Sequence, residues 1–392
     1  HSRSSICPER CLIWYNLDIQ VIPWQVKVGE SQEVYKLGRD SFWSDISQEP
    51  NRWRSAKLML ERVINFYPPM YESLKKIIQQ HQPDCLVIDR SVIPAMNIAQ
   101  QNNLPFVIQS RFLGSFVKPD PKYPQFGTAY SIHMNLWQKC LNILNPLFAQ
   151  FYLFPTLIKL NRVRQQCTNQ EKLPLPWEGQ TTIVGTSFGI EIPRPIPPNI
   201  HVVGPIFPRA MQPLNDSLQD WLESDNRLVV YIAFGTLATP NAWQASALVE
   251  GLTNAGVRGL WSLPEAQRSI LPQLPATFRI EPFVEQRAVL SHSKVAAFIS
   301  HCGMNSINEA LYYGKPILAL PFFGDQHYNA ARLVDLGVAL KLNKQNFSGT
   351  EVRRKLDQIL LIQSYRDNAS QIAKTLQQTS GLDKSAEIIE SI

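Results

Sequence analysis

The chain has 392 residues, of which 44% are hydrophobic and 18% are charged, and its formal net charge is +6. This composition is typical of a globular protein with a large buried interior and excludes a disordered chain, and the length favours two domains. The positive charge is spread along the sequence without a run of like charges, so no nucleic acid partner is predicted.

The six cysteines, at positions 7, 11, 85, 140, 167 and 302, do not form paired C-x-x-C motifs. The pattern therefore predicts neither a disulfide scaffold nor a zinc module, and no metal site is expected. Cys7 and Cys11 lie close enough in sequence to suggest a metal or redox site, but we interpret them as incidental thiols.

Strand-like and helix-like segments alternate in the first half, which is typical of parallel sheets covered by helices. Strands are predicted at residues 18–23, 85–89, 106–109 and 182–185, and helices at 52–66, 70–80 and 94–101. The most apolar segment, residues 136–160, contains Pro146, Pro155 and several polar residues. It predicts a buried helix pair kinked at the two prolines; peripheral membrane contact is the alternative interpretation.

A proline-rich stretch at residues 191–208 predicts an extended connector, with the linker at 204–213. The predicted domains are therefore residues 1–206 and 207–392. Strands in the second half are predicted at residues 228–234, 257–262, 278–281, 295–300, 316–320 and 338–342. The predicted fold class is α/β, with two facing doubly wound Rossmann-like domains and a ligand site in the crevice between them.

Polar residues follow the predicted strand at 295–300 and open the next helix. His301 and Gly303 occupy the loop, and Asn305 and Ser306 lie in the first helical turn. In a parallel α/β sheet, this junction presents free backbone N–H groups and the positive end of the helix dipole. Gly303 lets the backbone approach a ligand closely. The pattern predicts a phosphate or diphosphate site.

Further groups suit the two ends of a nucleotide sugar. Glu309 lies one helical turn beyond Asn305, where a carboxylate can accept hydrogen bonds from ribose hydroxyls. Asp325 and Gln326 follow the next predicted strand and suit a polyhydroxylated sugar. Each residue alone has a structural alternative, such as a helix cap; their joint placement at consecutive strand ends favours the ligand interpretation.

The segment from Phe283 to Gln326 resembles the nucleotide-sugar signature of the family 1 UDP-sugar-dependent glycosyltransferases, and is most similar to the fungal and animal branches. The resemblance implies a glycosyltransferase-B architecture and the following donor-binding residues: Gly235 and Thr236 near the diphosphate; Phe283 (in place of the usual tryptophan), Val284 and Gln286 at the uracil and ribose; His301, Gly303, Asn305 and Ser306 at the phosphates; Glu309 at the ribose; and Asp325 and Gln326 at the transferred sugar.

Family members begin with a strand and a Gly-rich loop that carries the catalytic histidine, and no such strand is found here. His1 has no strand before it. The N-terminal domain is therefore predicted to lack its first strand, either because the sequence is a fragment or because the domain is rearranged. The resemblance makes Asp89 the carboxylate that would orient this histidine; the alternative is that Asp89 caps the helix that begins near Val92.

The resemblance implies an inverting, metal-independent hexosyltransferase that uses UDP-glucose or another UDP-sugar, with no cofactor. The predicted acceptor is a lipophilic small molecule such as a sterol or phenol, bound by the loops after Gln109 and by residues 136–160. A catalytically silent UDP-sugar-binding subunit is the main alternative, ahead of an epimerase or a glycan phosphorylase. No compartment is predicted: the sequence as read suggests a cytoplasmic protein, whereas association with the endoplasmic reticulum membrane is expected if a signal peptide and a membrane anchor like those of animal relatives are missing from this sequence.

Overall fold

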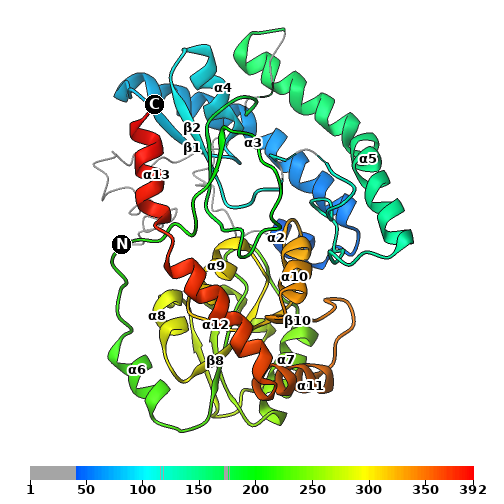
Figure 1. Cartoon of the computed structure of the whole chain (residues 1–392), viewed down its shortest axis with the longest axis vertical. Coiled ribbons are helices and arrows are strands. Elements are labelled where there is room, and N and C mark those ends of the chain that lie inside the picture. The colour runs from blue at the N-terminus through cyan, green and yellow to red at the C-terminus, as the bar shows by residue number, and fades with distance from the viewer. Residues whose placement is uncertain (1–40, 115, 118, 172–174, 176) are drawn as a thin grey trace.

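The structure is a computed structural model that describes residues 41–392, apart from 115, 118, 172–174 and 176. The predicted strand at residues 18–23 lies outside the described residues, as do His1, Cys7 and Cys11. Two parallel sheets, each packed against helices, form an upper and a lower domain in Figure 1. This is the α/β architecture that the alternating sequence pattern predicted.

The first sheet has four parallel strands in the order β1-β2-β3-β4. The first three strands lie within one residue of the predicted bounds, whereas the fourth was predicted to be part of an extended connector. The bounds are β1 Leu86–Asp89, β2 Phe106–Ser110, β3 Thr182–Val184 and β4 Ile200–Val202, with α4 Ile93–Gln101 after β1.

Helix α3 (Arg52–His81) continues through Pro68 and Pro69, so the prediction of two separate helices is wrong. The buried rings of Tyr67 and Tyr71 flank the two prolines and hold the helix on α4. The Tyr67 hydroxyl donates to Asn97 (2.7 Å), and the Tyr71 hydroxyl donates to a glutamine one turn further along α4 (2.5 Å). Packing on both sides of the prolines offsets the backbone hydrogen bonds that they remove.

Helix α5 (Leu136–Thr168) is one continuous helix that runs along the outer edge of the upper domain (Figure 1). The predicted buried helix pair is wrong, because the apolar side chains are largely exposed and polar ones are buried. Asn142 accepts from the Gln125 backbone N–H (2.7 Å), and Asn145 accepts from Arg52 (2.8 Å). By length and composition alone, α5 is long and apolar enough to cross a membrane. Only 17% of its most apolar window is buried, so it is not a core helix.

The second sheet has six parallel strands in the order β10-β9-β8-β5-β6-β7. Alternate residues of the buried strands face two cores: Val230 and Ile232 pack on one face, and Val229 and Tyr231 on the other. The strands are β5 Val229–Ala233, β6 Arg258–Ser262, β7 Phe278–Glu281, β8 Val295–Ser300, β9 Ile317–Ala319 and β10 Ala339–Lys341. The helices that cover this sheet are α7 Ala242–Asn254, α8 Gln286–Ser291, α9 Met304–Tyr312, α10 Gln326–Asp335, α11 Gly349–Leu361 and α12 Gln363–Gln377, with a short 3-10 turn, η2, at Glu265–Ile270.

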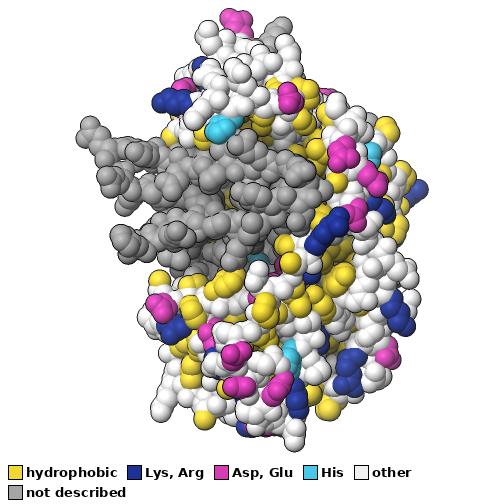
Figure 2. All heavy atoms as spheres, turned by 90° about the vertical axis from the view of Figure 1, so that its left-hand side faces the viewer, with side chains coloured by type: hydrophobic (Ala, Val, Ile, Leu, Met, Phe, Trp, Pro, Cys, Tyr) yellow, Lys and Arg dark blue, Asp and Glu magenta, His cyan; other side chains and the backbone are white. Residues whose placement is uncertain are grey.

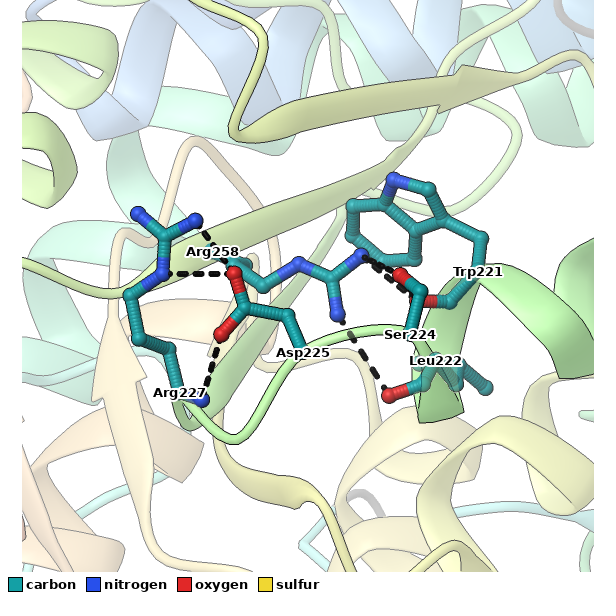
Figure 3. A network of polar contacts seen from close by, with 6 residues as sticks. All are labelled: Trp221, Leu222, Ser224, Asp225, Arg227 and Arg258. Carbon is teal, nitrogen blue, oxygen red and sulfur yellow. Dashed lines mark hydrogen bonds and ion pairs between the residues drawn. The ribbon is translucent and has the colours of Figure 1, made fainter.

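Helix α6 (Asp216–Glu223) follows the connector and is fixed to the second sheet by the buried side chain of Arg258 (Figure 3). The guanidinium lies over the Trp221 ring, 3.8 Å from its centroid. It also donates to the backbone carbonyls of Trp221 (2.5 Å) and Leu222 (3.4 Å). A cation at the C-terminal end of a helix stabilises its unpaired carbonyls, so Arg258 fixes where the second domain begins.

Two helices cross between the domains. Helix α2 (Ser41–Gln48) places Trp43 and Ile46 in the core of the second domain. The Lys344 ammonium donates to three backbone carbonyls, those of Ser47 (2.8 Å), Glu49 (2.8 Å) and Phe322 (2.6 Å), and so joins the end of α2 to the β9–α10 loop.

The chain end crosses in the other direction. Helix α13 (Gly381–Glu390) lies beside the first sheet in Figure 1. Its Ile388 and Ile389 pack against Val107, Ile183 and Val203 of the first domain. The predicted boundary between residues 206 and 207 falls in the connection between β4 and α6.

On the face drawn in Figure 2, basic and acidic side chains of the described residues are interspersed over the lower domain.

Candidate donor site at the domain crevice

Three neighbouring strands of the second sheet end at the same level. Ala233 of β5 pairs with Ser300 of β8, and Ser300 also pairs with Ala319 of β9. The loops that follow these strands therefore lie side by side at the carboxyl edge of the sheet. Strand β5 comes first in the chain among the strands of this sheet, and later strands are added on both of its sides, β6 and β7 on one and β8 to β10 on the other. Doubly wound sheets bind ligands at this point where the strand order reverses.

The imidazole of His301 lies between two of these loops. A Cβ atom placed on Gly235 would lie 2.9 Å from the His301 ring, and one on Gly303 would lie 2.5 Å from its Nε2. Gly235 also has a φ of +69°, which disfavours any residue with a side chain. The two glycines therefore leave room for the ring and hold it in place, and Thr236 is exposed beside it.

Helix α9 begins directly behind this ring. Gly303 is its N-cap residue and provides no side-chain hydrogen bond to the helix start. Ser306 is buried in the first turn, whereas His301, Gly303 and Asn305 keep part of their surface exposed. Uncapped backbone N–H groups, the helix dipole and these side chains together form a site suited to a diphosphate.

A hydrogen-bonded group joins α8 to α9. The Gln286 amide donates to Glu309 (2.5 Å) and to the Ser306 hydroxyl (3.3 Å), and its oxygen accepts from the Tyr231 hydroxyl (3.3 Å). Burial raises the pKa of Tyr231, so this hydroxyl stays protonated and can donate. The structure thus brings Gln286, Ser306 and Glu309 together, although β7 and β8 are not neighbours in the sheet.

Phe283 is exposed to 64% in the loop after β7, while the next residue, Val284, is buried in the core. An exposed aromatic ring anchored by a buried neighbour provides a flat apolar surface on which a base can stack. This placement is compatible with the role that the family resemblance implies for Phe283.

Asp325 and Gln326 lie at the start of α10, beside the His301 loop. Asn329 donates to the Asp325 carboxylate (2.7 Å) and to the Cys302 carbonyl (2.9 Å), so it connects the two loops. The Gln326 oxygen accepts from the backbone N–H groups of Phe322 (2.8 Å) and its neighbour, and thus shapes the β9–α10 loop. Only its amide nitrogen remains to donate to a sugar hydroxyl.

Burial raises the pKa of the Asp325 carboxyl, while the hydrogen bond from Asn329 and the charge of Arg111 act in the opposite direction. Arg111 follows β2 and also forms an ion pair with Asp89, at 3.3 Å. Asp89 accepts from the backbone N–H of Ser91 (2.9 Å). Helix α4 has Val92 as its N-cap without a side-chain bond, so Asp89 does not cap this helix.

The donor-site helix contacts the end of the first sheet directly. Asn308 of α9 donates to the Gly185 carbonyl at the end of β3 (2.7 Å). The Thr186 hydroxyl contacts the Met304 sulfur at 3.5 Å. The loop before α5 also reaches α10, where the Ser131 hydroxyl donates to Asp335 (2.5 Å). The predicted anion site therefore lies at the interface between the two domains.

Sequence analysis did not identify Arg111, Glu191, Asn308 and Asn329. Buried Glu191 accepts from the Leu113 backbone N–H (3.2 Å), and burial, together with the charge of Asp325, raises the pKa of Glu191. The spacing of Asp325 and Asn329, four residues apart on one helix, was a usable signal. Within the described parts of residues 41–392, no three His, Cys, Asp or Glu side chains gather in a way that could hold a metal ion.

Solved structures share this architecture. The chain is 17% identical to Os79 from O. sativa in complex with UDP, over 90% of this chain and 86% of that one, with a TM-score of 0.63. It is 16% identical to the glycotransferase of kitacinnamycin, over 88% of this chain and 84% of that one, with a TM-score of 0.63. The chain thus has the glycosyltransferase-B fold.

The UDP-glucoronosyl and UDP-glucosyl transferase family matches residues 61–389, and the chain belongs to this family. It is 29% identical over 382 residues to UDP-glycosyltransferase 1 of Phaeomoniella chlamydospora, covering 90% of this chain and 76% of that one. It is 24% identical over 360 residues to UDP-glucuronosyltransferase 2B15 of Homo sapiens, covering 87% and 66%. The resemblance to fungal and animal family members predicted from the sequence is confirmed.

Proposed function

We propose that this protein transfers a hexose from a UDP-sugar to a hydroxyl group of a lipophilic small molecule, with inversion at the anomeric carbon. The observation that carries the proposal is the uncapped start of α9, with His301 held beside it by Gly235 and Gly303. Such a site suits a diphosphate, and polar groups for two sugars lie on either side of it.

Each end of the donor has a matching group. Phe283 provides a stacking surface for the uracil, and Gln286 and Glu309 form a hydrogen-bonded pair beyond the helix start, where they suit the ribose. Asp325 lies at the other side of the His301 loop, where its carboxylate accepts from hydroxyls of the transferred sugar. The Gln326 amide nitrogen donates beside it.

The proposed reaction is one displacement. The acceptor oxygen forms a bond to the anomeric carbon as the bond from that carbon to the UDP oxygen breaks, and the acceptor proton passes to a base. Negative charge grows on the departing diphosphate, where the α9 dipole, His301 and the Asn305 and Ser306 side chains stabilise it. These groups do the work that a metal ion does elsewhere, so the proposed reaction needs no metal or other cofactor.

The acceptor is proposed to bind in the first domain, after β2. Phe112 stacks on Phe126 with ring centroids 5.0 Å apart, and Phe126 lies 5.9 Å from the ring of Tyr328 on α10. This aromatic group, drawn from both domains, suits a sterol-like or phenolic molecule. Helix α5 contributes little to such a pocket, because its apolar side chains point away from the domain.

A catalytically silent UDP-sugar-binding subunit is the second candidate. It is favoured by the surroundings of Asp89, whose carboxylate is engaged by Ser91 and Arg111 in the described part of the chain. The family resemblance pairs this carboxylate with a histidine base on a Gly-rich loop, and no matching strand and loop were found in this sequence.

One experiment separates the candidates. The full-length protein is assayed with a panel of UDP-sugars and phenolic and sterol acceptors, with and without a chelator, while UDP binding is measured by calorimetry. Turnover that survives the chelator supports the proposed transferase, and turnover abolished by the chelator contradicts its metal independence. UDP binding without turnover favours the silent subunit. Absence of UDP binding refutes both.

A further inference from the structure

Helix α5 has an inverted distribution of polarity. Its side facing the domain carries Asn142, Asn145, Thr156 and Arg164, all buried. Exposed apolar residues recur at three- and four-residue spacing on the opposite side, as at Leu144, Leu147, Phe151, Phe154 and Ile158. The outward residues form a continuous stripe on one helical face. A helix in water is expected to show the reverse arrangement, so this stripe is a binding surface rather than a packing face.

We propose that the outward face of α5, defined by the five apolar residues above, lies on an anionic lipid surface. Between Lys139 and Lys159 the helix carries no charged residue, a distance of roughly 30 Å along its axis. The charged side chains of α5 are all cationic, and Lys139, Lys159 and Arg162 are exposed. Large apolar side chains flanked by cations are the features by which interfacial helices bind anionic lipids.

The contacts of α5 show that it lies along the lipid surface and does not cross it. Its inner side is held by hydrogen bonds such as those of Asn142 with Gln125 (2.7 Å) and Tyr123 (2.8 Å). Insertion across a bilayer would break these bonds and leave buried polar groups unpaired in hydrocarbon, which costs several kcal/mol per group. Figure 1 shows the helix at the outer edge of the upper domain, with no other described helix or strand on its far side.

A second copy of the chain fits this face less well. An antiparallel pair of α5 helices would place Lys139 of one copy near Lys159 and Arg162 of the other. A parallel pair would place each cation beside its own equivalent. Both arrangements bring like charges together, which is unfavourable next to an apolar interface.

The test is flotation of the whole chain with vesicles of phosphatidylcholine, with and without phosphatidylserine. We expect binding to the anionic vesicles. In the double variant Leu147→Gln and Phe151→Gln, the partition coefficient should fall at least tenfold, which corresponds to about 1.4 kcal/mol. Both side chains are largely exposed (62% and 83%), so thermal unfolding should stay close to that of the unmodified protein. A matched control is Leu361→Gln on α11, at a residue that is 77% exposed and far from α5 in the sequence.

A second double variant, Lys139→Gln with Lys159→Gln, should lose binding to anionic vesicles and leave the weak binding to neutral vesicles unchanged. The proposal is overturned if the unmodified protein does not float with anionic vesicles, or if the Leu361 variant loses as much binding as the α5 variant. It is also overturned if sedimentation shows a dimer that the Leu147 and Phe151 substitutions dissociate, because a second copy then covers the face.

Discussion

Replacement of Gly235 by alanine tests the central element of the donor site. The new Cβ atom would lie 2.9 Å from both Cε1 and Nε2 of His301. Carbon atoms in contact are normally about 3.5 to 4 Å apart, so the imidazole must move by roughly 1 Å. The same substitution forces an alanine into the left-handed region, at a φ of +69°.

The two effects have different magnitudes and different readouts. The left-handed conformation costs about 1 to 2 kcal/mol of folding stability. Displacement of the ring removes one charge-assisted hydrogen bond to the diphosphate, worth about 1.5 to 3 kcal/mol. The dissociation constant for UDP should therefore rise by roughly 10- to 100-fold.

Gly256→Ala is the matched control. Gly256 has a φ of +68°, and a Cβ atom placed there has no neighbour within 4 Å. It should lose the same folding stability in urea unfolding and bind UDP normally by calorimetry. Gly303→Ala provides the converse case, because its φ of −66° is ordinary and its Cβ would lie 2.5 Å from Nε2 of His301. If Gly235→Ala and Gly303→Ala bind UDP as tightly as the unmodified protein, His301 does not hold the phosphates.

Three further predictions concern stability. Burial, followed by the charges of nearby cations, lowers the pKa of His327 to about 4. The unfolded state therefore binds more protons than the native state between pH ~6.5 and ~4, so the folding stability falls as the pH drops through this window. Urea titrations at pH 7 and pH 4 measure this fall, and His327→Gln should reduce it by about 3 kcal/mol. Lys344→Met leaves three backbone carbonyls between α2 and the loop after β9 without their donor, and should lower the free energy of unfolding by about 2 to 4 kcal/mol. The surface variant Lys57→Met should change it by less than ~0.5 kcal/mol, and equal effects of the two variants would contradict the role of Lys344. Arg258→Met keeps the apolar stem but loses the carbonyl contacts at the end of α6, so we expect a loss of about 2 to 3 kcal/mol in urea unfolding, and an unchanged midpoint would refute it.

Most strands could be predicted from the sequence because they are buried on both faces. Such strands appear as short apolar runs that end in glycine, proline or polar residues, and the bounds of β8 agree with the predicted ones. Strand β4 was not predicted because it has only three residues and lies in a proline-rich segment. An edge strand tolerates nearby prolines, since one side of its backbone needs no partner strand.

The helices that were predicted wrongly depend on tertiary contacts. Tyr67 and Tyr71 pack in the core on either side of the two prolines in α3, and the local sequence does not reveal this packing. In α5, apolar content suggested burial, but the position of the helix at the edge of the domain turned that face outward. The sequence predicts that α5 has an apolar stripe, whereas only the tertiary structure shows whether that stripe faces the core or the outside of the domain.

The site could be predicted to the extent that it follows from strand order. His301 and Asp325 come together because β8 and β9 pair in parallel and end at the same level. Gln326 shows the limit of this reasoning, because its oxygen is used by two backbone N–H groups of its own loop. A polar residue at a strand end can serve the loop, the ligand or both, and sequence position alone does not distinguish these roles.

The residues that the sequence could not reveal act across the crevice. Arg111 and Glu191 belong to the first domain, yet the charge of Arg111 lowers the pKa of Asp325 in the second, and the charge of Asp325 raises the pKa of Glu191. Their distances to Asp325 depend on how the domains are held, and α2 and α13 each anchor one domain to the other. A change in domain position would therefore alter the charge state of the group proposed to bind the transferred sugar. In this geometry, the arginine that pairs with Asp89 also favours the ionised form of Asp325, so one side chain of the first domain acts on a carboxylate of each domain.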